Sequence, residues 1–189
     1  LRLHSIKSCD TIFNFNNNST LSYSDTCATE TKFKEVASNS DILHIATHGF
    51  FFPKFDFNRE KLRTDNTQKN IPFRGTELTP SVNYVMSKDP LMRSGIVFAG
   101  ADDYWNGLSH TGIDDGILTA LEVANIDLKH SKLIVLSACE TGLGDINGTE
   151  GVYGLQRAFK MAGAENIIMS LWQIPDKETS EFMKLFYGK

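Results

Sequence analysis

The stretch KLIVLSAC at 132–139 decides the fold, because an apolar, β-branched run stops at a cysteine and polar, glycine-rich sequence follows it. Runs of similar character are DILHIATHGF at 41–50, SGIVFAGA at 94–101 and ENIIMSLW at 165–172. Nearly continuous apolar runs are typical of strands that are buried on both faces of a parallel sheet. The sequence therefore predicts four such strands, with residue 139 at the carboxyl end of one of them.

Amphipathic patterns between and after these runs predict helices over 29–37, 114–126, 148–163 and 176–186. In 114–126 the pattern rests on Ile117, Leu121 and Ala124, with two aspartates at the start, where the helix dipole favours acids. Thr149 is placed to cap the third helix and Gly163 to end it. Strands that alternate with helices favour a three-layer α/β fold with a mostly parallel central sheet.

The 189 residues can bury one compact core, so we expect a single domain over 1–189 with loop-rich segments at 1–25 and 52–93. The asparagine-rich part 11–25 is predicted to be a loop. The segment 52–93 holds four of the five prolines, and such long connections are usually lids or mobile segments. A disordered tether is the alternative. The first residue, Leu1, and the closing helical pattern suggest a part of a longer chain.

Charge and cysteine content exclude several classes of function. A net charge of −4 would repel a phosphate backbone, so no nucleic-acid partner is expected. The three widely spaced cysteines fit neither a disulfide framework nor a zinc knuckle, which favours a reducing, cytoplasmic compartment. No apolar run reaches the roughly 18 residues that span a bilayer, so no membrane association is expected.

Two side chains at strand ends suggest nucleophilic catalysis. Cys139 should lie at the carboxyl edge of the sheet, where open α/β sheets bind ligands, and His48 should end the strand over 41–47 at the same edge. A thiol and an imidazole at one edge are the parts of a cysteine nucleophile with its acid and base. Gly49 could let a backbone N–H approach an oxyanion. The alternatives are a buried apolar cysteine and a structural histidine, as we expect for His44 within the strand.

Other chemistries fit less well. The glycines of GLGDING at 142–148 suggest a phosphate-binding turn, but the predicted helix starts too late and no acidic residue stands about 20 residues further on. A metal site built from His44, His48 and Cys139 lacks a fourth ligand. We expect neither a metal nor a cofactor.

Several stretches together resemble the CHAT domains, a family of caspase-like cysteine peptidases related to separase. They are HIATHGF, DPLMRSGIVFAGA, DDGILTALEVANIDL, KLIVLSACETGLG, GTEGVYGLQRAFKMAGAENIIMSLWQIPD and FMKLFY, and they cover most of 41–187. The resemblance implies a three-layer caspase-like sandwich, with His48 and Cys139 as the catalytic dyad. It also implies that Gly49 and Cys139 supply oxyanion-hole N–H groups, and that Asp176 is similar to the aspartate of the primary specificity pocket in separase.

By this resemblance the chain is a cysteine endopeptidase that cleaves a protein partner after a basic residue. Asp176 follows a predicted strand and Pro175, so its carboxylate should reach the same edge as the dyad, where it could pair with a substrate arginine. The alternative for Asp176 is a helix cap. The alternative for the chain is a catalytically silent scaffold. Family members often carry tetratricopeptide repeats, which implies a regulatory repeat region in the full-length chain.

Overall fold

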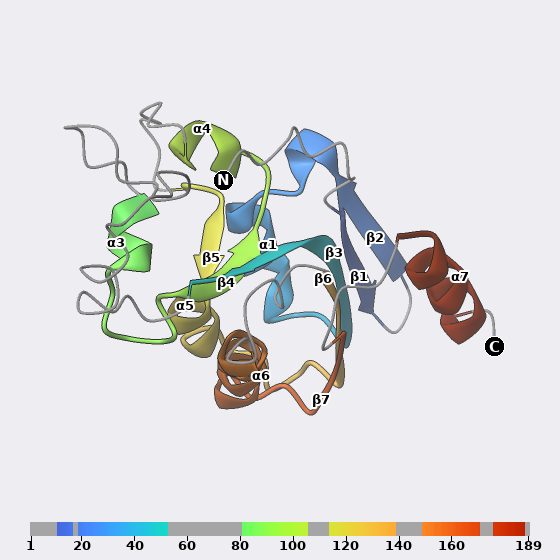
Figure 1. Cartoon of the computed structure of the whole chain (residues 1–189). Helices are drawn as coiled ribbons and strands as arrows, with labels where there is room; N and C mark the ends of the chain where they lie inside the picture. The colour runs from blue at the N-terminus through green and yellow to red at the C-terminus, as the bar shows by residue number, and fades with distance from the viewer. Residues whose placement is uncertain are drawn as a thin grey trace.

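One mixed sheet organises the chain, which is seen here as a computed structural model that describes residues 11–16, 19–52, 81–105, 114–138, 149–170 and 176–187 (Figure 1). Its strands are β1 (Thr11–Asn16), β2 (Ser19–Ser24), β3 (Ile42–Phe51), β4 (Ser94–Val97), β5 (Ile117–Thr119), β6 (Leu133–Ala138) and β7 (Asn166–Met169). The helices are α1 (Glu30–Ala37), α3 (Ser81–Val85), α4 (Ala101–Trp105), α5 (Ala120–Ala124), α6 (Thr149–Met161) and α7 (Asp176–Tyr187), with a 3₁₀ turn at Asp25–Cys27.

The centre of the sheet is parallel and its flanks are antiparallel. Strand β6 lies between β3 and β7 and runs parallel to both. Strands β1 and β4 each pair antiparallel with β3, and they carry β2 and β5 respectively. The prediction of parallel strands is confirmed for β6, for β7 and for the part of β3 that pairs with β6, whereas the run at 94–101 supplies the antiparallel β4. An apolar run reports burial on both faces and carries no information on strand direction.

Two stretches fold differently from the sequence prediction. The polar segment 11–25, expected to be a loop, forms the hairpin partners β1 and β2, with β2 at an edge of the sheet. An edge strand needs only one apolar face, and on β2 Tyr23 packs against the core while Ser22 and Ser24, on the opposite face, are exposed. The predicted helix over 114–126 divides into β5 and α5. Gly116 has a φ of +73°, and Thr119 forms a capping box with Glu122, so the helix begins only at Ala120.

The core lies on the face of the sheet that is covered by α1, α5 and α6. Leu43 and Ile45 of β3 are buried in one cluster with Phe33 of α1 and Phe159 of α6. Side chains alternate along a strand, so His44 points to the opposite face, where its ring stacks on Tyr187 of α7 with centroids 5.5 Å apart. Figure 1 shows α7 on the far side of β1 and β3 from α1 and α6.

The other helix predictions agree with the structure. Thr29 caps α1 by accepting a hydrogen bond from the Lys32 N–H at 3.1 Å. In α6 the predicted apolar stripe is buried at Leu155 and Phe159. Gly163 follows α6 with a φ of +103°, the left-handed conformation that commonly ends a helix. Because α1 and α6 pack against β3 in the core, they hold in place the strand that contains His48 and Gly49.

Candidate active site

Strand β3 changes its partners at the position of the candidate histidine. Its first half pairs in parallel with β6, and the last pair of that register is Thr47 with Ala138. From His48, which lies opposite Val97, it pairs with the antiparallel β4. The Thr47 hydroxyl donates to the Val97 carbonyl and ties the two halves together. Ligand sites of open α/β sheets lie outside the carboxyl ends of the parallel strands, and β6 reaches its carboxyl end at this level of β3.

His48 therefore lies inside β3 and does not end it, which corrects the sequence prediction of a strand over 41–47. The strand continues to Phe51 because β4 provides a new partner where β6 stops. His48 is half-buried and occupies the same face of β3 as His44, since the two residues are an even number of positions apart. The sequence pattern placed His48 correctly beside the end of β6, although it misjudged the length of β3.

Gly49 has a backbone orientation suited to an oxyanion donor. The Phe52 N–H donates to the Arg93 carbonyl across the β3 and β4 pair at 2.8 Å. In an antiparallel pair every second residue directs its N–H to the partner strand, so Phe50 and His48 share that direction with Phe52. The N–H of Gly49 consequently points away from β4, and Gly49 itself is buried.

Two of the four predicted site residues lie wholly or partly outside the described residues. Cys139 is not among them, although it follows Ala138 of β6 directly in the sequence. Asp176 is the first residue of α7, and only its backbone is described. Thus the structure places His48 and Gly49 next to the end of β6, while the positions of the thiol and of the carboxylate stay predictions.

His44 is a buried core residue, as predicted. Its Nε2 lies 3.0 Å from the Ser137 hydroxyl of β6, and 7% of its surface is exposed. Burial lowers the pKa of His44 because the charged imidazolium would lose hydration. The ring that covers it belongs to Tyr187, whose pKa burial raises to about 12. This histidine is therefore neutral and structural near pH 7.

An aromatic cluster follows His48 along β3, and the sequence analysis did not identify it. It consists of Phe50, Phe52, Tyr84 and Trp105, which come from the end of β3, from α3 and from α4. The ring centroids of Phe50 and Trp105 lie 5.8 Å apart, and those of Tyr84 and Trp105 lie 6.2 Å apart. A Cβ at Gly95 would approach the Phe50 ring to 2.7 Å, so this glycine makes room for the cluster.

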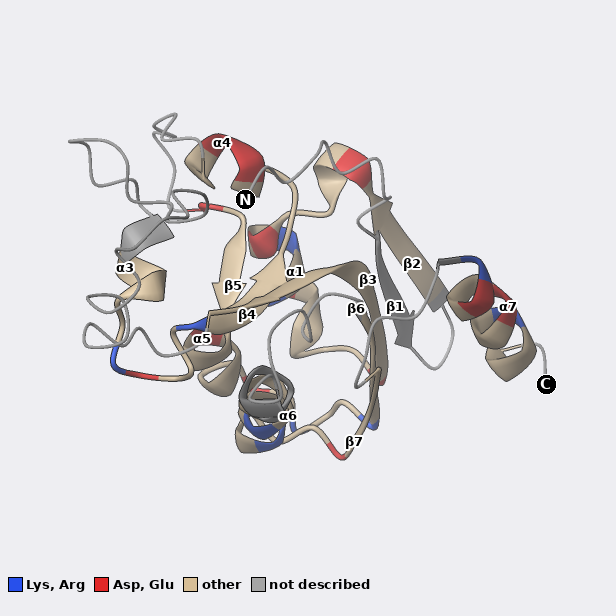
Figure 2. Cartoon of the chain, viewed as in Figure 1, with Lys and Arg blue, Asp and Glu red and all other residues tan. Residues whose placement is uncertain are grey.

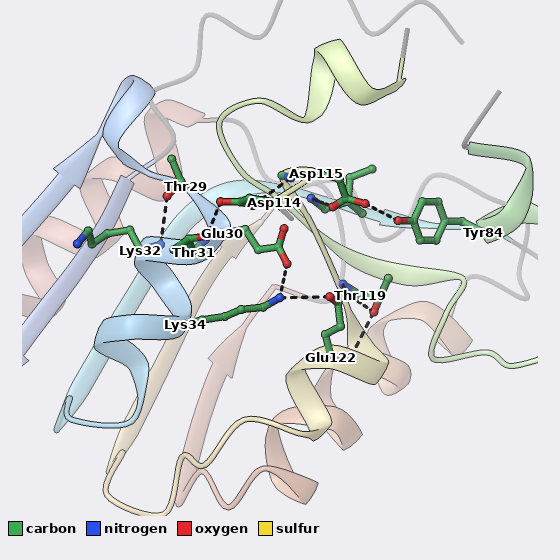
Figure 3. A network of polar contacts seen from close by, with 12 residues as sticks. Thr29, Glu30, Thr31, Lys32, Lys34, Tyr84, Asp114, Asp115, Thr119 and Glu122 are labelled. Carbon is green, nitrogen blue, oxygen red and sulfur yellow. Dashed lines mark hydrogen bonds and ion pairs between the residues drawn. The ribbon is translucent and has the colours of Figure 1, made fainter. Parts of the chain in front are cut away.

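A network of carboxylates links α1 to the turn before β5 (Figure 3). Glu30 is 2% exposed and receives a hydrogen bond from the Lys34 ammonium, which also contacts Glu122 at 3.2 Å. Burial, together with hydrogen bonding to Asp114, raises the pKa of Glu30 to about 8. For Asp114 the effect of burial is outweighed by hydrogen bonds from Glu30, Thr31 and Gly116, which lower its pKa.

The turn before β5 is also hydrogen-bonded to Tyr84 of the aromatic cluster. The Tyr84 hydroxyl donates to Asp115 Oδ2 at 2.8 Å, and Asp115 Oδ1 accepts from the Ile117 N–H at 2.9 Å. Burial and the adjacent Asp115 raise the pKa of Tyr84. The pattern Thr119-x-x-Glu122 was the one readable signal for this region, because it is a capping box; the long-range contacts of Glu30 have no local signature.

The charges of the described surface are mixed. Figure 2 shows acidic residues on α4, which are Asp102 and Asp103, and basic residues on α6. Over the described ranges, no group of three His, Cys, Asp or Glu side chains could hold a metal ion. Within the same ranges no helix has the length and apolar character needed to cross a membrane.

Comparison with known proteins extends this picture. The family model described as "CHAT domain" matches residues 9–189. Tetratricopeptide repeat protein 28 of Homo sapiens is 35% identical over 72 residues, which are 38% of this chain and 3% of that protein. Its Mus musculus counterpart is 36% identical over 73 residues, with the same shares. The chain thus matches about 3% of the length of these curated relatives. No solved structure gives a significant match.

Proposed function

The chain belongs to the CHAT domain family, a caspase-like family, and on that premise we propose that it is a cysteine endopeptidase with His48 and Cys139 as its dyad. The observation that carries the proposal is the register of β3 against β6. Thr47 lies opposite Ala138, and the next residues of the two strands in the sequence are His48 and Cys139. We further propose that the complete domain is a three-layer caspase-like sandwich.

In the proposed reaction the Cys139 thiolate attacks the scissile carbonyl carbon. The carbonyl oxygen becomes an oxyanion that accepts hydrogen bonds from the N–H groups of Gly49 and Cys139. As the carbon–nitrogen bond breaks, His48 gives a proton to the departing amine, and a thioester remains on Cys139. Water then attacks the thioester and gives a proton to His48, and the carbon–sulfur bond breaks. This step releases the carboxylic acid and restores the Cys139 thiolate and the protonated His48 of the first step. Each well-placed oxyanion donor contributes about a hundredfold in rate.

Two observations support Gly49 as an oxyanion donor. The alternation of hydrogen bonds along β3 directs its N–H away from β4. The residue also has no side chain, so a substrate carbonyl can approach the backbone closely. A substitution of Gly49 by a β-branched residue would therefore obstruct the position that the substrate occupies.

Asp176 supports the proposed preference for a basic residue before the scissile bond. It is the first residue of α7 and follows Pro175. A carboxylate that is partly removed from water is stabilised by a substrate guanidinium through two parallel charge-assisted hydrogen bonds. Cleavage after arginine, and less well after lysine, is the expected specificity. Profiling a peptide library with wild type and Asp176→Ala should show loss of this preference, whereas a helix cap would leave it unchanged.

The full-length protein is proposed to carry a regulatory tetratricopeptide-like region and to cleave a protein partner in the cytoplasm. The curated relatives that match are named as tetratricopeptide repeat proteins, and the matched segment is a small part of their length. An attached repeat region could bind the substrate or hold the peptidase inactive, so the isolated domain and the full-length chain are expected to differ in activity.

The experiment that tests the proposal is labelling with a peptide that carries a cysteine-reactive acyloxymethyl ketone. Full-length wild type should form one adduct at Cys139, located by mass spectrometry, and Cys139→Ala should form none. Cys27→Ala is the matched control, because Cys27 is an exposed free cysteine at the end of the 3₁₀ turn. Labelling that is unchanged in Cys139→Ala would contradict the peptidase and favour a catalytically silent scaffold.

A further inference from the structure

Arg93 is a buried cation that the described part of the chain leaves unpaired. It directly precedes β4 and is 2% exposed. Its Nε and Nη1 atoms are buried and make no hydrogen bond, and none of the ion pairs of the described residues involves it. Only its backbone is engaged, through Phe52 and Pro90. Arginines that are so deeply buried are otherwise almost always paired.

Such an arrangement is costly in the isolated chain. A guanidinium stays charged at any physiological pH, so burial cannot be relieved by losing a proton. Two buried donors without acceptors also lose the hydrogen bonds that water would give them. The planar fork of donors matches a carboxylate, which can accept two parallel hydrogen bonds from it.

Arg93 also has a defined position relative to the candidate dyad. The Phe52 N–H donates to its carbonyl, and Phe52 lies four residues beyond His48 on β3. At about 3.3 Å per residue this separation is about 13 Å along the strand. His48 lies opposite Val97, and Arg93 is four residues before Val97, so His48 and Arg93 lie on the same face of the β3 and β4 pair. An extended peptide that crosses this face with its scissile bond at His48 would reach the level of Arg93 with its fourth residue or one adjacent to it.

We propose that Arg93 is a binding site for a carboxylate, and that the ligand is an acidic side chain of the substrate about four residues from the scissile bond. The proposal rests on the peptidase function given above. It adds a second determinant of specificity to Asp176, of opposite charge preference and on a different element, directly before β4. A substrate is then recognised by a basic residue at the scissile bond and an acidic residue at a fixed distance from it.

Binding to the full-length protein with Cys139→Ala tests this proposal without requiring catalysis. The probes are fluorescein-labelled dodecapeptides of alanine and serine with a central arginine or, in a second set, a central leucine. Each carries one aspartate, moved through every position, and has an asparagine twin. Fluorescence polarisation should show about tenfold tighter binding of aspartate over asparagine three to five residues from the centre. Adding Arg93→Met should abolish that difference.

The matched control is Arg157→Met, which removes the same charge from an exposed position of α6 and should leave the aspartate preference intact. Thermal unfolding of Arg93→Met should show an unchanged or higher Tm, since methionine fills the site without an unpaired charge. The proposal is overturned if no position prefers aspartate, if Arg93→Met keeps the preference, or if it unfolds at a clearly lower temperature, which would assign the guanidinium an internal partner. An Arg93-dependent preference in a protein that cleaves nothing would refute the peptidase alone.

Discussion

The two halves of β3 differ in their surroundings although they are one strand. In the first half β1 and β6 both pair with the strand, and the His44 ring lies against Ser137 and Tyr187. The second half begins where the register with β6 ends, and there His48 and Gly49 lie opposite β4. Two histidines on the same face of one strand thus meet different conditions. The difference teaches that two residues of the same type in one strand are distinguished by their partner strands, and it is the reason why we propose His48 and not His44 as the acid and base.

The largest effect is expected from His48→Ala. If the second half of β3 carries the acid and base, turnover of a peptide substrate should fall by about 10²–10⁴-fold, the usual contribution of a positioned general acid or base. The Tm should change little, because the half-buried imidazole is not part of the main core. Steady-state kinetics and thermal unfolding on the same preparation measure both quantities. Near-normal turnover in this variant would show that the dyad is wrongly assigned.

The second prediction concerns His44→Ala, which should keep most of the activity and lose stability. The change removes the ring that stacks on Tyr187 and leaves the Ser137 hydroxyl without its partner, at an expected cost of about 1–3 kcal/mol in the free energy of unfolding. Urea denaturation measures this loss, with Ser137→Ala as the partner variant. A double variant no less stable than His44→Ala alone would show that the two side chains act together.

The free energy of unfolding should depend on pH partly through His44. Burial lowers the pKa of His44 below the ordinary histidine value of 6.5, so the unfolded chain takes up this proton first as the pH falls. The stability contributed by neutral His44 is present above pH 6.5 and is lost as the pH falls from there through the lower folded-state pKa. His44→Phe should flatten this part of the profile.

The fourth prediction concerns Glu30, in the network that links α1 to the turn before β5. Burial raises the pKa of Glu30 from its ordinary value of 4.5 to about 8, so between these pH values the folded protein holds a proton that the unfolded chain releases. The resulting stability is complete below pH 4.5 and is lost as the pH rises to 8, with a slope of at most about 1.4 kcal/mol per pH unit. Glu30→Gln, which cannot ionise, should remove this slope in urea denaturation series. A variant with the wild-type slope would rule out Glu30 as its source.

The sequence predicted the parts of this molecule whose information is local. Strand β6 and the end of α6 follow from periodicity and from the conformational preference of Gly163. The cap at Thr149 stays a prediction, because Thr149 is the first residue of α6 and only its backbone is described. The predictions for 11–25 and 114–126 were wrong because the structure of these segments depends on residues that are distant in the sequence. The polar stretch 11–16 forms a strand because β3 pairs with it. The helical pattern of 114–126 is interrupted near its start by Gly116, whose positive φ the hydrophobic spacing does not reveal.

The residues of the candidate site also divide into those that the local sequence indicates and those that only the structure reveals. The residues His48 and Gly49 were found from their place after an apolar run, and the structure adds that β3 passes beyond them and takes β4 as a partner. By contrast, Arg93 and Glu30 are conspicuous only in three dimensions. An arginine before a strand and a glutamate in the first turn of a helix are ordinary in sequence, and only their burial reveals that each is unusual.

The smallest effect is expected at the start of the first half of β3. Lys132 Nζ lies 3.0 Å from Asp41 Oδ1, and the two residues precede β6 and β3, at the ends of these strands that are farther from His48. The lysine side chain is 63% exposed, so water and salt screen the pair, and Lys132→Ala should cost less than about 1 kcal/mol. The N–H groups of Lys132 and Leu133 also donate to the Asp41 carbonyl, and these backbone bonds persist in the variant. Urea denaturation at low and high salt measures the effect, which should shrink as salt is added. A loss of several kcal/mol, or any loss of turnover, would mean that the first half of β3 is held less by its backbone partners than its register indicates.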